Sequence, residues 1–291
     1  MPLRWGLAGG KPQAAGGLMA LAGNGFVPDF VMVPQGLPAA DHAEMAAAAA
    51  QIGTPLLEND KTRLAALSAR LDILLVCRFE LVPPEVFAAP RIAALNIHSS
   101  LLPSYRGVHP VSWALVDGVE ETGVTIHRID AGIDTGPIVA QSVQPIHDHH
   151  DLWSLTKDLD RLAADLAVEV FRHIAASGTL PPAIAPRHPS SYGRRRTAAD
   201  GRIDWQKPAR AVFDLVRALP PPMPPAFTTG PDGTMTAVLT ARQAVTSPLA
   251  DARPGTVLAV DDQGWAEIQC GGGSRLQARL DPMPIPGTQF T

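Results

Sequence analysis

The sequence DILLVCRF, residues 72–79, is a continuous apolar run that lies between turn signals. Such a run is typical of a strand that is buried on both faces of a parallel sheet. Working outward, further strand candidates are the apolar or β-branched runs at residues 3–8, 30–33, 91–98, 123–130 and 138–143. Segments rich in Ala and Leu predict helices at residues 39–51, 61–71 and about 151–176. Because strands and helices alternate, we expect a Rossmann-like α/β fold, an open and mainly parallel sheet with helices on both faces.

The composition changes near Gly178, where Pro and Gly become frequent and the long apolar pattern ends. We therefore expect a first domain at residues 1–180, a linker at 181–200 and a second domain at 201–291. One helix is predicted at residues 207–219, and short strand-like runs follow at Phe227, 234–240, 255–260, 265–269 and 275–280. Several short strands at this spacing predict a small β-barrel or sandwich.

The charge balance and the apolar pattern argue against several classes of protein. The 24 Lys and Arg residues face 28 Asp and Glu residues, a net charge of −4, whereas nucleic-acid-binding domains usually have a basic excess or a basic face. No apolar stretch of about 18 residues is present, and polar residues interrupt the N-terminus where a signal peptide needs an apolar segment. Two distant cysteines make neither a disulfide framework nor a zinc site. We expect a cytoplasmic protein that does not associate with membranes.

Chemistry is indicated first by the motif LNIHSSLLPSYRG at residues 95–107. Asn96 and His98 are two residues apart on a predicted strand, so their side chains leave the same face. An amide donor can hydrogen-bond a developing oxyanion, and an imidazole can handle a proton near neutral pH, so the pair suits acyl transfer. An ordinary strand end with a surface histidine is the alternative reading of the same residues.

The second motif, TGVTIHRIDAGIDTG at residues 122–136, places Asp134 in a Gly-flanked loop after a strand. Two parallel strands joined by one crossover would bring this loop beside His98. A carboxylate near an imidazole orients the ring and stabilises its protonated form. The alternative is that Asp130 and Asp134 are turn residues only.

Three motifs in the same order resemble the formyltransferases that use 10-formyltetrahydrofolate: LNIHSSLLPSYRG, ETGVTIHRIDAGIDTGPIV and DGRIDWQKPARAVFDLVRALPPPMPPAFTT. The resemblance implies a catalytic domain followed by a small β-barrel-like domain of the OB type. It implies that Asn96, His98 and Asp134 are catalytic and that no metal takes part. Folate-binding residues implied by it are Arg78, Phe79, Glu80, Leu81, Val82, Asp130, Ala131, Gly132, Ile133 and Gly136. Candidate substrate-binding residues are Ser99, Ser100, Tyr105 and Arg106, of which Arg106 could hold an anionic group.

The formyl acceptor is predicted from charge. Where tRNA-dependent family members have a long basic loop, residues 33–45 read VPQGLPAADHAEM, without Lys or Arg. Residues 197–291 contain eight Lys and Arg against nine Asp and Glu. We therefore expect a small amine, a nucleotide-linked aminosugar first and an amino acid such as hydroxyornithine second; methionyl-tRNA comes third, and tRNA is not an expected partner. Protonated His98 would stabilise the oxyanion with Asn96, and Asp134 would accept the proton that the amine loses.

Other readings of the chain stay open. A non-catalytic folate-binding paralogue, a hydrolase that releases formate, and a homodimer are each compatible with the sequence. The cluster His147, His149 and His150 suggests a metal site or, more simply, a polar loop before a helix that Asp151 caps. Cys77 lies in an apolar strand and is expected to be a buried structural thiol.

Overall fold

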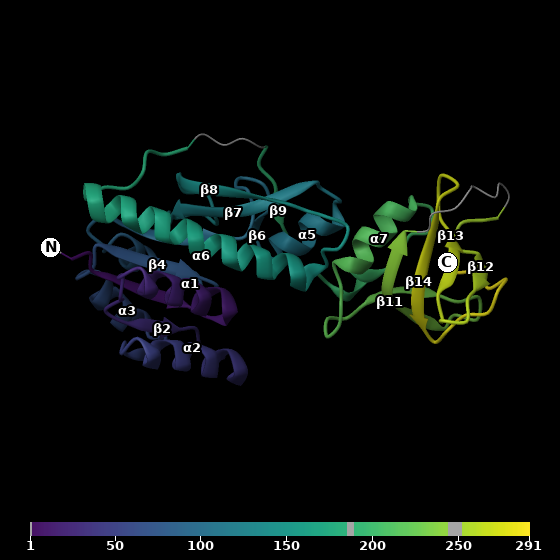
Figure 1. The fold of residues 1–291 in the computed structure, drawn as a ribbon, viewed down its shortest axis with the longest axis horizontal. Coiled ribbons are helices and arrows are strands. Elements are labelled where there is room, and N and C mark those ends of the chain that lie inside the picture. The colour runs from purple at the N-terminus through teal and green to yellow at the C-terminus, as the bar shows by residue number, and fades with distance from the viewer. Residues whose placement is uncertain (1, 185–188, 244–251) are drawn as a thin grey trace. The chain divides into compact units, whose positions relative to one another are not determined.

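The computed structural model describes residues 2–184, 189–243 and 252–291 (Figure 1). The chain divides into two compact units. The first unit comprises Met1–Pro110, Glu121–Pro145 and Thr156–Gly193, and the second comprises Val111–Glu120, Ile146–Leu155 and Arg194–Thr291. Neither unit is therefore one continuous stretch of sequence.

A seven-stranded sheet organises the first unit, in the order β3-β2-β1-β4-β5-β7-β8. Its strands are β1 (Trp5–Gly9), β2 (Val31–Val33), β3 (Leu56–Glu58), β4 (Ile73–Cys77), β5 (Ala93–His98), β7 (Glu121–Arg128) and β8 (Ile138–Pro145). The strands from β3 to β5 are parallel neighbours, whereas β7 and β8 are added antiparallel at one edge. All residues of β4, the strand predicted to be doubly buried, are buried. The predicted mainly parallel α/β fold is confirmed.

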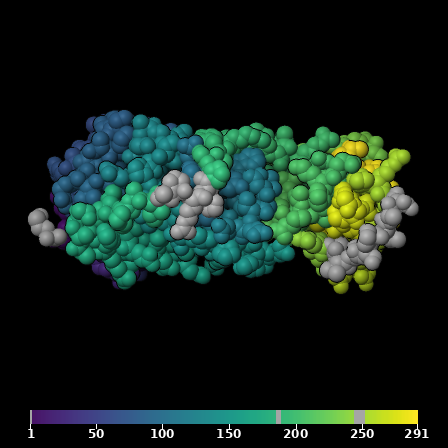
Figure 2. All heavy atoms as spheres, turned by 90° about the horizontal axis from the view of Figure 1, so that it is seen from above, coloured from purple at the N-terminus to yellow at the C-terminus, as the bar shows by residue number. Residues whose placement is uncertain are grey.

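Helices cover both faces of this sheet. On one face Trp5 of β1 packs edge-to-face on Phe171, with ring centroids 4.9 Å apart. On the other face Ala8 of the same strand packs with Leu64 and Val86. The helices of the first unit are α1 (Lys11–Gly23), α2 (Ala39–Gln51), α3 (Lys61–Ser68), α4 (Pro84–Phe87) and most of α6 (Leu152–Ser177), whereas α5 (Pro110–Val116) belongs, apart from Pro110, to the second unit. Figure 2 shows all heavy atoms of the chain as spheres, in the colour scheme of Figure 1.

Two features of the first unit differ from the sequence-based expectations. α1 and β3 were not predicted, because α1 contains several glycines and β3 is only three residues long. β7 was expected to be parallel to β5 but pairs with it antiparallel, and His98 lies opposite Thr125. An antiparallel strand added at the edge of a parallel sheet is common in mixed sheets and needs no crossover helix.

The second unit contains a five-stranded antiparallel sheet in the order β10-β11-β14-β13-β12. Its strands are β10 (Ala226–Thr229), β11 (Met235–Gln243), β12 (Val257–Val260), β13 (Ala266–Gln269) and β14 (Arg275–Asp281). Val212 and Phe213 of α7 (Ala209–Arg217) belong to one buried core with Ile268 and Leu276 of the sheet. The small antiparallel β domain is present in the C-terminal part of the chain as predicted, and α7 falls within the predicted helix at residues 207–219.

The remaining sequence-based candidates have structural explanations. The Asp151 carboxylate accepts a 2.8 Å hydrogen bond from the Ser154 backbone N–H and so caps α6, as predicted. In the part of the chain that the structure describes, no three His, Cys, Asp or Glu side chains are grouped to hold a metal ion. Burial raises the pKa of the Cys77 thiol to about 12, in agreement with a structural role. Among the same described residues, no helix has the length and apolarity that a membrane span requires.

Candidate active site

β5 and β7 present Asn96, His98 and a further histidine, His127, on one face of the sheet. Asn96 and His98 are two residues apart on β5, so their side chains leave the same face, as predicted. Asn96 lies directly opposite His127 of β7, and side chains of such a pair share a face. Val124 and Ile126 alternate with His127 and are buried on the opposite face.

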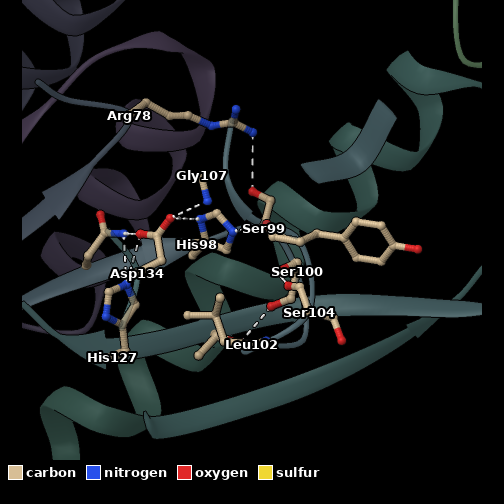
Figure 3. A network of polar contacts seen from close by, with 12 residues as sticks. Arg78, His98, Ser99, Ser100, Leu102, Ser104, Gly107, His127 and Asp134 are labelled. Atoms are coloured by element: carbon tan, nitrogen blue, oxygen red, sulfur yellow. Dashed lines mark hydrogen bonds and ion pairs between the residues drawn. The ribbon is translucent and has the colours of Figure 1, made fainter. Parts of the chain in front are cut away.

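Asp134 follows β7, in a loop that places its carboxylate between His98 and Gly107 on one side and His127 on the other (Figure 3). Its Oδ2 atom lies 3.5 Å from His98 Nδ1 and accepts a 2.8 Å hydrogen bond from the Gly107 backbone N–H. Its Oδ1 atom lies 3.4 Å from Asn96 Nδ2 and 3.4 Å from His127 Nε2. Asp134 has φ +51°, a left-handed conformation that few residues other than glycine adopt. The structure thus brings together the three residues predicted to be catalytic.

The two ring nitrogens of His98 have different partners. Nε2 lies 2.9 Å from the Tyr105 carbonyl oxygen, which can only accept, so Nε2 bears a proton. Burial lowers the pKa of His98, although the charge of Asp134 and the Tyr105 carbonyl act in the opposite direction. The ring is therefore neutral at neutral pH, with an unprotonated Nδ1 that faces Asp134. In its neutral form the imidazole can accept a proton at Nδ1, and the expected oxyanion role of a protonated His98 stays a prediction.

Asp134 is ionised in the same site. Burial raises the pKa of its carboxyl group, but the neighbouring His127 and His98 rings and the hydrogen bond from the Gly107 N–H outweigh burial and hold the pKa below its ordinary value. His98 Nδ1 and Asp134 Oδ2 face each other at 3.5 Å. Such a pair can accept one proton and share it.

The loop after β5 is fixed by its own polar residues. Ser99 Oγ accepts hydrogen bonds of 3.2 Å from both Arg78 Nη2 and Gln13 Nε2. Ser100 Oγ donates to the Ser104 carbonyl oxygen at 2.7 Å. Ser99 and Ser100 are buried, and in the described structure their hydroxyls hold the loop that follows β5; their predicted contact with substrate stays a prediction.

A second segment, Pro189 to Gly193, runs beside this loop. β6 (Arg106–Gly107) pairs in parallel with β9 (Tyr192–Gly193). Ser191 accepts from the Tyr105 backbone N–H through Oγ at 2.8 Å and from the Arg106 backbone N–H through its carbonyl at 3.0 Å. The segment lies within residues 181–200, the expected linker, and nothing in its sequence signals these contacts. The predicted anion-binding role of Arg106 stays a prediction; its Nε atom is buried without a hydrogen-bond partner among the described residues.

The first predicted folate segment, residues 78–82, follows β4, and its Arg78 contacts the loop after β5 through Ser99. Arg78 has φ +54° and donates from Nε to Gln13 Oε1 at 2.7 Å. Glu80 accepts from the Gln35 backbone N–H at 3.1 Å. Phe79 and Val82 pack on the neighbouring core, whereas Leu81 is 74% exposed. Hydrogen bonds and packing therefore hold the segment in place, and the apolar Leu81 side chain is exposed to solvent.

The second predicted folate segment, residues 130–136, is a self-stabilised turn. The Asp130 carboxylate accepts from the Gly132 backbone N–H at 3.0 Å and from Thr135 Oγ1 at 2.6 Å. A Cβ atom at Gly136 would collide with the Arg128 carbonyl, so this position requires glycine. Ala131 is exposed, and Ile133, next to Asp134, is 41% exposed. The turn thus presents an apolar side chain next to Asp134.

Comparison with known proteins shows the relationship of both units. Residues 35–171 match the family described as formyl transferase, and residues 195–283 match the formyl transferase C-terminal domain. Methionyl-tRNA formyltransferase of Thiobacillus denitrificans is 35% identical over 278 residues, which cover 92% of this chain and 88% of that protein. Methionyl-tRNA formyltransferase of Sorangium cellulosum is 34% identical and covers 78% of this chain and 73% of its own length.

Similar solved structures share the fold at low sequence identity. The N-formyltransferase of Helicobacter canadensis, solved with folinic acid and dTDP-3-aminofucose, matches with a TM-score of 0.70 and 20% identity, and covers 96% of this chain and 99% of that one. WlaRD, a sugar 3N-formyl transferase solved with dTDP and 5-N-formyl-THF, matches with a TM-score of 0.70 and 17% identity. The match covers 96% of this chain and 98% of that one. These structures support the fold and leave the acceptor undetermined.

Proposed function

This chain belongs to the formyltransferase family, and from this premise we propose that it transfers the formyl group of 10-formyltetrahydrofolate to a primary amine at Asn96, His98 and Asp134. The chain is a formyl-transferring enzyme on the strength of both family matches and of relatives that are 35% identical. The observation that supports this particular site is the convergence of Asn96 and His98 on the two oxygens of Asp134, at 3.4 and 3.5 Å.

The geometry suggests a division of labour between the three residues. When the amine nitrogen attacks the formyl carbon, the new C–N bond forms and the formyl oxygen becomes an oxyanion, which the Asn96 amide N–H can stabilise. The nitrogen then loses a proton, and the pair formed by His98 Nδ1 and Asp134 Oδ2 can accept it because neither atom is protonated beforehand. Collapse of the oxyanion breaks the bond to the folate nitrogen, and the proton held by the pair can pass to that leaving group.

The residues around the site fit a folate. Bound 10-formyltetrahydrofolate would supply the activated formyl group. Leu81 and Ile133 are apolar and exposed on the two predicted folate segments, as a flat aromatic ring system requires. Both segments are stiffened from within, by the Arg78–Gln13 hydrogen bond in one and by the Asp130 turn in the other. A site made in advance loses little conformational entropy when a ligand binds.

The sequence relatives support methionyl-tRNA as the first candidate acceptor. Proteins of that name match this chain over most of their own length, 88% in the case of Thiobacillus denitrificans. The expectation that tRNA is not a partner is therefore not supported, and its basis, low positive charge, is weaker than a match of this extent. Binding of tRNA to a chain with net charge −4 would depend on local basic patches.

A small amine is the second candidate, and one specific observation favours it. Residues 197–291 have one more acidic than basic residue, so this part of the chain gives no general attraction to a polyanion. The amine of a nucleotide-linked sugar or of hydroxyornithine would need only local recognition. The two candidates thus differ in the salt dependence that they predict.

The test is a transfer assay with purified protein, 10-formyltetrahydrofolate and three acceptors: methionyl-tRNA, a nucleotide-linked aminosugar and hydroxyornithine. We expect one acceptor to yield N-formyl product by mass spectrometry. Asn96→Ala, His98→Ala and Asp134→Ala should each lower its formation at least about 10²-fold, and double variants should lose little more. His173→Ala is the matched control, because His173 is an exposed histidine on α6.

The assay also distinguishes the other classes of function. Formate released without any acceptor indicates a hydrolase, and folate binding without product from any acceptor indicates a non-catalytic paralogue. Full activity in all three alanine variants would place the chemistry elsewhere. A formylation rate of methionyl-tRNA that falls steeply with salt would support tRNA as the acceptor, whereas salt-independent formylation of a small amine would support the second candidate.

A further inference from the structure

We infer that His127, which sequence patterns did not single out, is a positioning residue that fixes the amide of Asn96 in the orientation needed for catalysis. The inference rests on the proposed function, since it assigns the donor role to Asn96. His127 is 2% exposed and lies opposite Asn96 in the β5–β7 pair. Both of its ring nitrogens have polar partners, so it is not a histidine buried for packing alone.

The partners of His127 determine which nitrogen bears the proton. Nδ1 lies 2.8 Å from the carbonyl oxygen of Arg128, which can only accept, so Nδ1–H donates to it. With that proton on Nδ1, Nε2 is the ring nitrogen that can accept a hydrogen bond. Asn96 Nδ2 lies 3.1 Å from that nitrogen, within hydrogen-bond distance.

This arrangement fixes the direction of the Asn96 amide. His127 Nε2 and Asp134 Oδ1 are both acceptors, at 3.1 and 3.4 Å from the same Asn96 nitrogen. The amide NH₂ must therefore face them, and its own oxygen must face away. One N–H is held by His127 at the shorter distance, and the other reaches Asp134 at the long end of the hydrogen-bond range.

The unequal distances give the two N–H groups different tasks. The weak 3.4 Å contact with Asp134 can be exchanged for a developing formyl oxyanion at little cost. Once that N–H leaves Asp134, the bond to His127 is the contact that keeps the amide from rotating. Orientation that is established before the reaction spares reorganisation in the transition state.

The first arm of the test compares two substitutions of His127. In His127→Gln the side-chain oxygen can replace Nε2 as acceptor, and in His127→Leu no acceptor is present. We expect kcat of His127→Leu to fall about 10–100-fold, because a misplaced donor costs up to about 10²-fold, with the KM for 10-formyltetrahydrofolate within about threefold. His127→Gln should recover to within about threefold of wild type, and His173→Gln is the surface control. Equal losses in the Gln and Leu variants, or full activity in both, would overturn the inference.

The second arm needs no turnover. In the unmodified protein with ¹⁵N-labelled histidine, long-range ¹H–¹⁵N NMR at pH 8 should show His127 protonated at Nδ1 and bare at Nε2, the signal being assigned by its loss in His127→Gln. An Nε2–H tautomer would mean that Asn96 does not donate to the ring, and the inference would fail whatever the activity. If wild type formylates no acceptor but the Nδ1–H tautomer is present, the proposed function fails and the amide-fixing role survives.

Discussion

Two aspartates, one in each unit, are held in opposite ways. Asp214 of α7 receives 2.8 Å hydrogen bonds from Arg210 Nε on one oxygen and from Arg217 Nε on the other. Among the described residues, Asp134 has one contact of that length, from the Gly107 N–H, and its side-chain neighbours lie at 3.4 to 3.5 Å. Asp214 is thus paired with permanent cations, whereas Asp134 faces groups whose protonation can change.

The difference in contacts distinguishes a carboxylate that stabilises the fold, Asp214, from one that is suited to proton transfer, Asp134. A carboxylate held by short contacts to arginine cannot take a proton from its partner, because arginine does not release its proton in proteins. Arg217 also donates to the His147 carbonyl oxygen at 2.8 Å, so the Asp214 pair connects elements within the second unit. Long contacts to histidine and amide groups cost little to exchange and suit a carboxylate that must accept and return a proton.

Replacing each aspartate by asparagine should give the largest effects, on the rate of formyl transfer in one variant and on stability in the other. Asp134→Asn removes the proton acceptor, so formyl transfer should fall at least about 10²-fold. Asp214→Asn leaves two arginines with an uncharged partner, which should lower the free energy of unfolding by about 3–5 kcal/mol. Initial rates and urea unfolding of both variants provide the measurement.

Each variant is the control for the other. Asp134→Asn should unfold within about 1 kcal/mol of wild type, and folded Asp214→Asn should keep its rate within about threefold. The comparison breaks if Asp134→Asn transfers formyl within about threefold of wild type, or if Asp214→Asn loses activity while its stability is unchanged.

A glycine beside each aspartate allows a smaller test. Gly107 has φ +88°, and a Cβ atom there would lie 2.7 Å from the Tyr192 ring. Gly118 has φ +64°, and its Cβ would lie 2.8 Å from Asp214 Oδ2. Alanine at either position should destabilise the protein by about 1–3 kcal/mol, through backbone strain and crowding.

Activity should separate the two glycine variants. Gly107 donates its N–H to Asp134, so displacement of its backbone in Gly107→Ala should lower kcat about tenfold. Gly118→Ala should keep its kcat within about twofold, since Gly118 lies beside the structural aspartate. Thermal unfolding and kcat of both proteins check this, and an equal loss of kcat in the two variants would show that strain alone, without Asp134, is responsible.

Much of the fold follows from local sequence. The apolar run at β4 and the Ala-rich α2, whose bounds agree with the prediction, are specified by hydrophobicity and helix propensity. α1 escaped prediction because its Gly16–Gly17 pair lowers helix propensity. The helix forms because one side of it, including Leu18 and Leu21, is buried in the unit.

The site was predictable only where its residues belong to local sequence motifs. Asn96, His98 and Asp134 belong to motifs, but the role of His127 depends on its register against Asn96, which sequence does not determine. The alternation of Val124 and Ile126 with Thr125 and His127 does place His127 on a polar face, and that signal was available. Contacts of Ser191 with the Tyr105 backbone join residues 86 apart, beyond the reach of any local pattern.

The smallest expected effect concerns the pH dependence of the transfer rate, whose decline on acidification should lie at a lower pH than an ordinary histidine would give. Burial lowers the pKa of His98, so its ring stays an unprotonated acceptor until the pH falls below the ordinary histidine value of about 6.5. The rate of transfer should therefore decline on acidification with a midpoint below about 6.5. A midpoint at or above that value would show that His98 is charged in the resting site and does not accept the proton.

The free energy of unfolding should also decrease as the pH falls. A histidine whose pKa is lowered by folding stabilises the native state fully above its unfolded pKa, and this contribution is lost as the pH falls through the folded pKa. Urea unfolding between pH 7.5 and pH 5 should show wild type losing stability more steeply than His98→Gln, which has no ring to protonate. Parallel curves for the two proteins would mean that burial does not penalise the charged ring. The proton acceptor would then have to be Asp134 alone, and the contrast with Asp214 would rest on one carboxylate rather than on a pair.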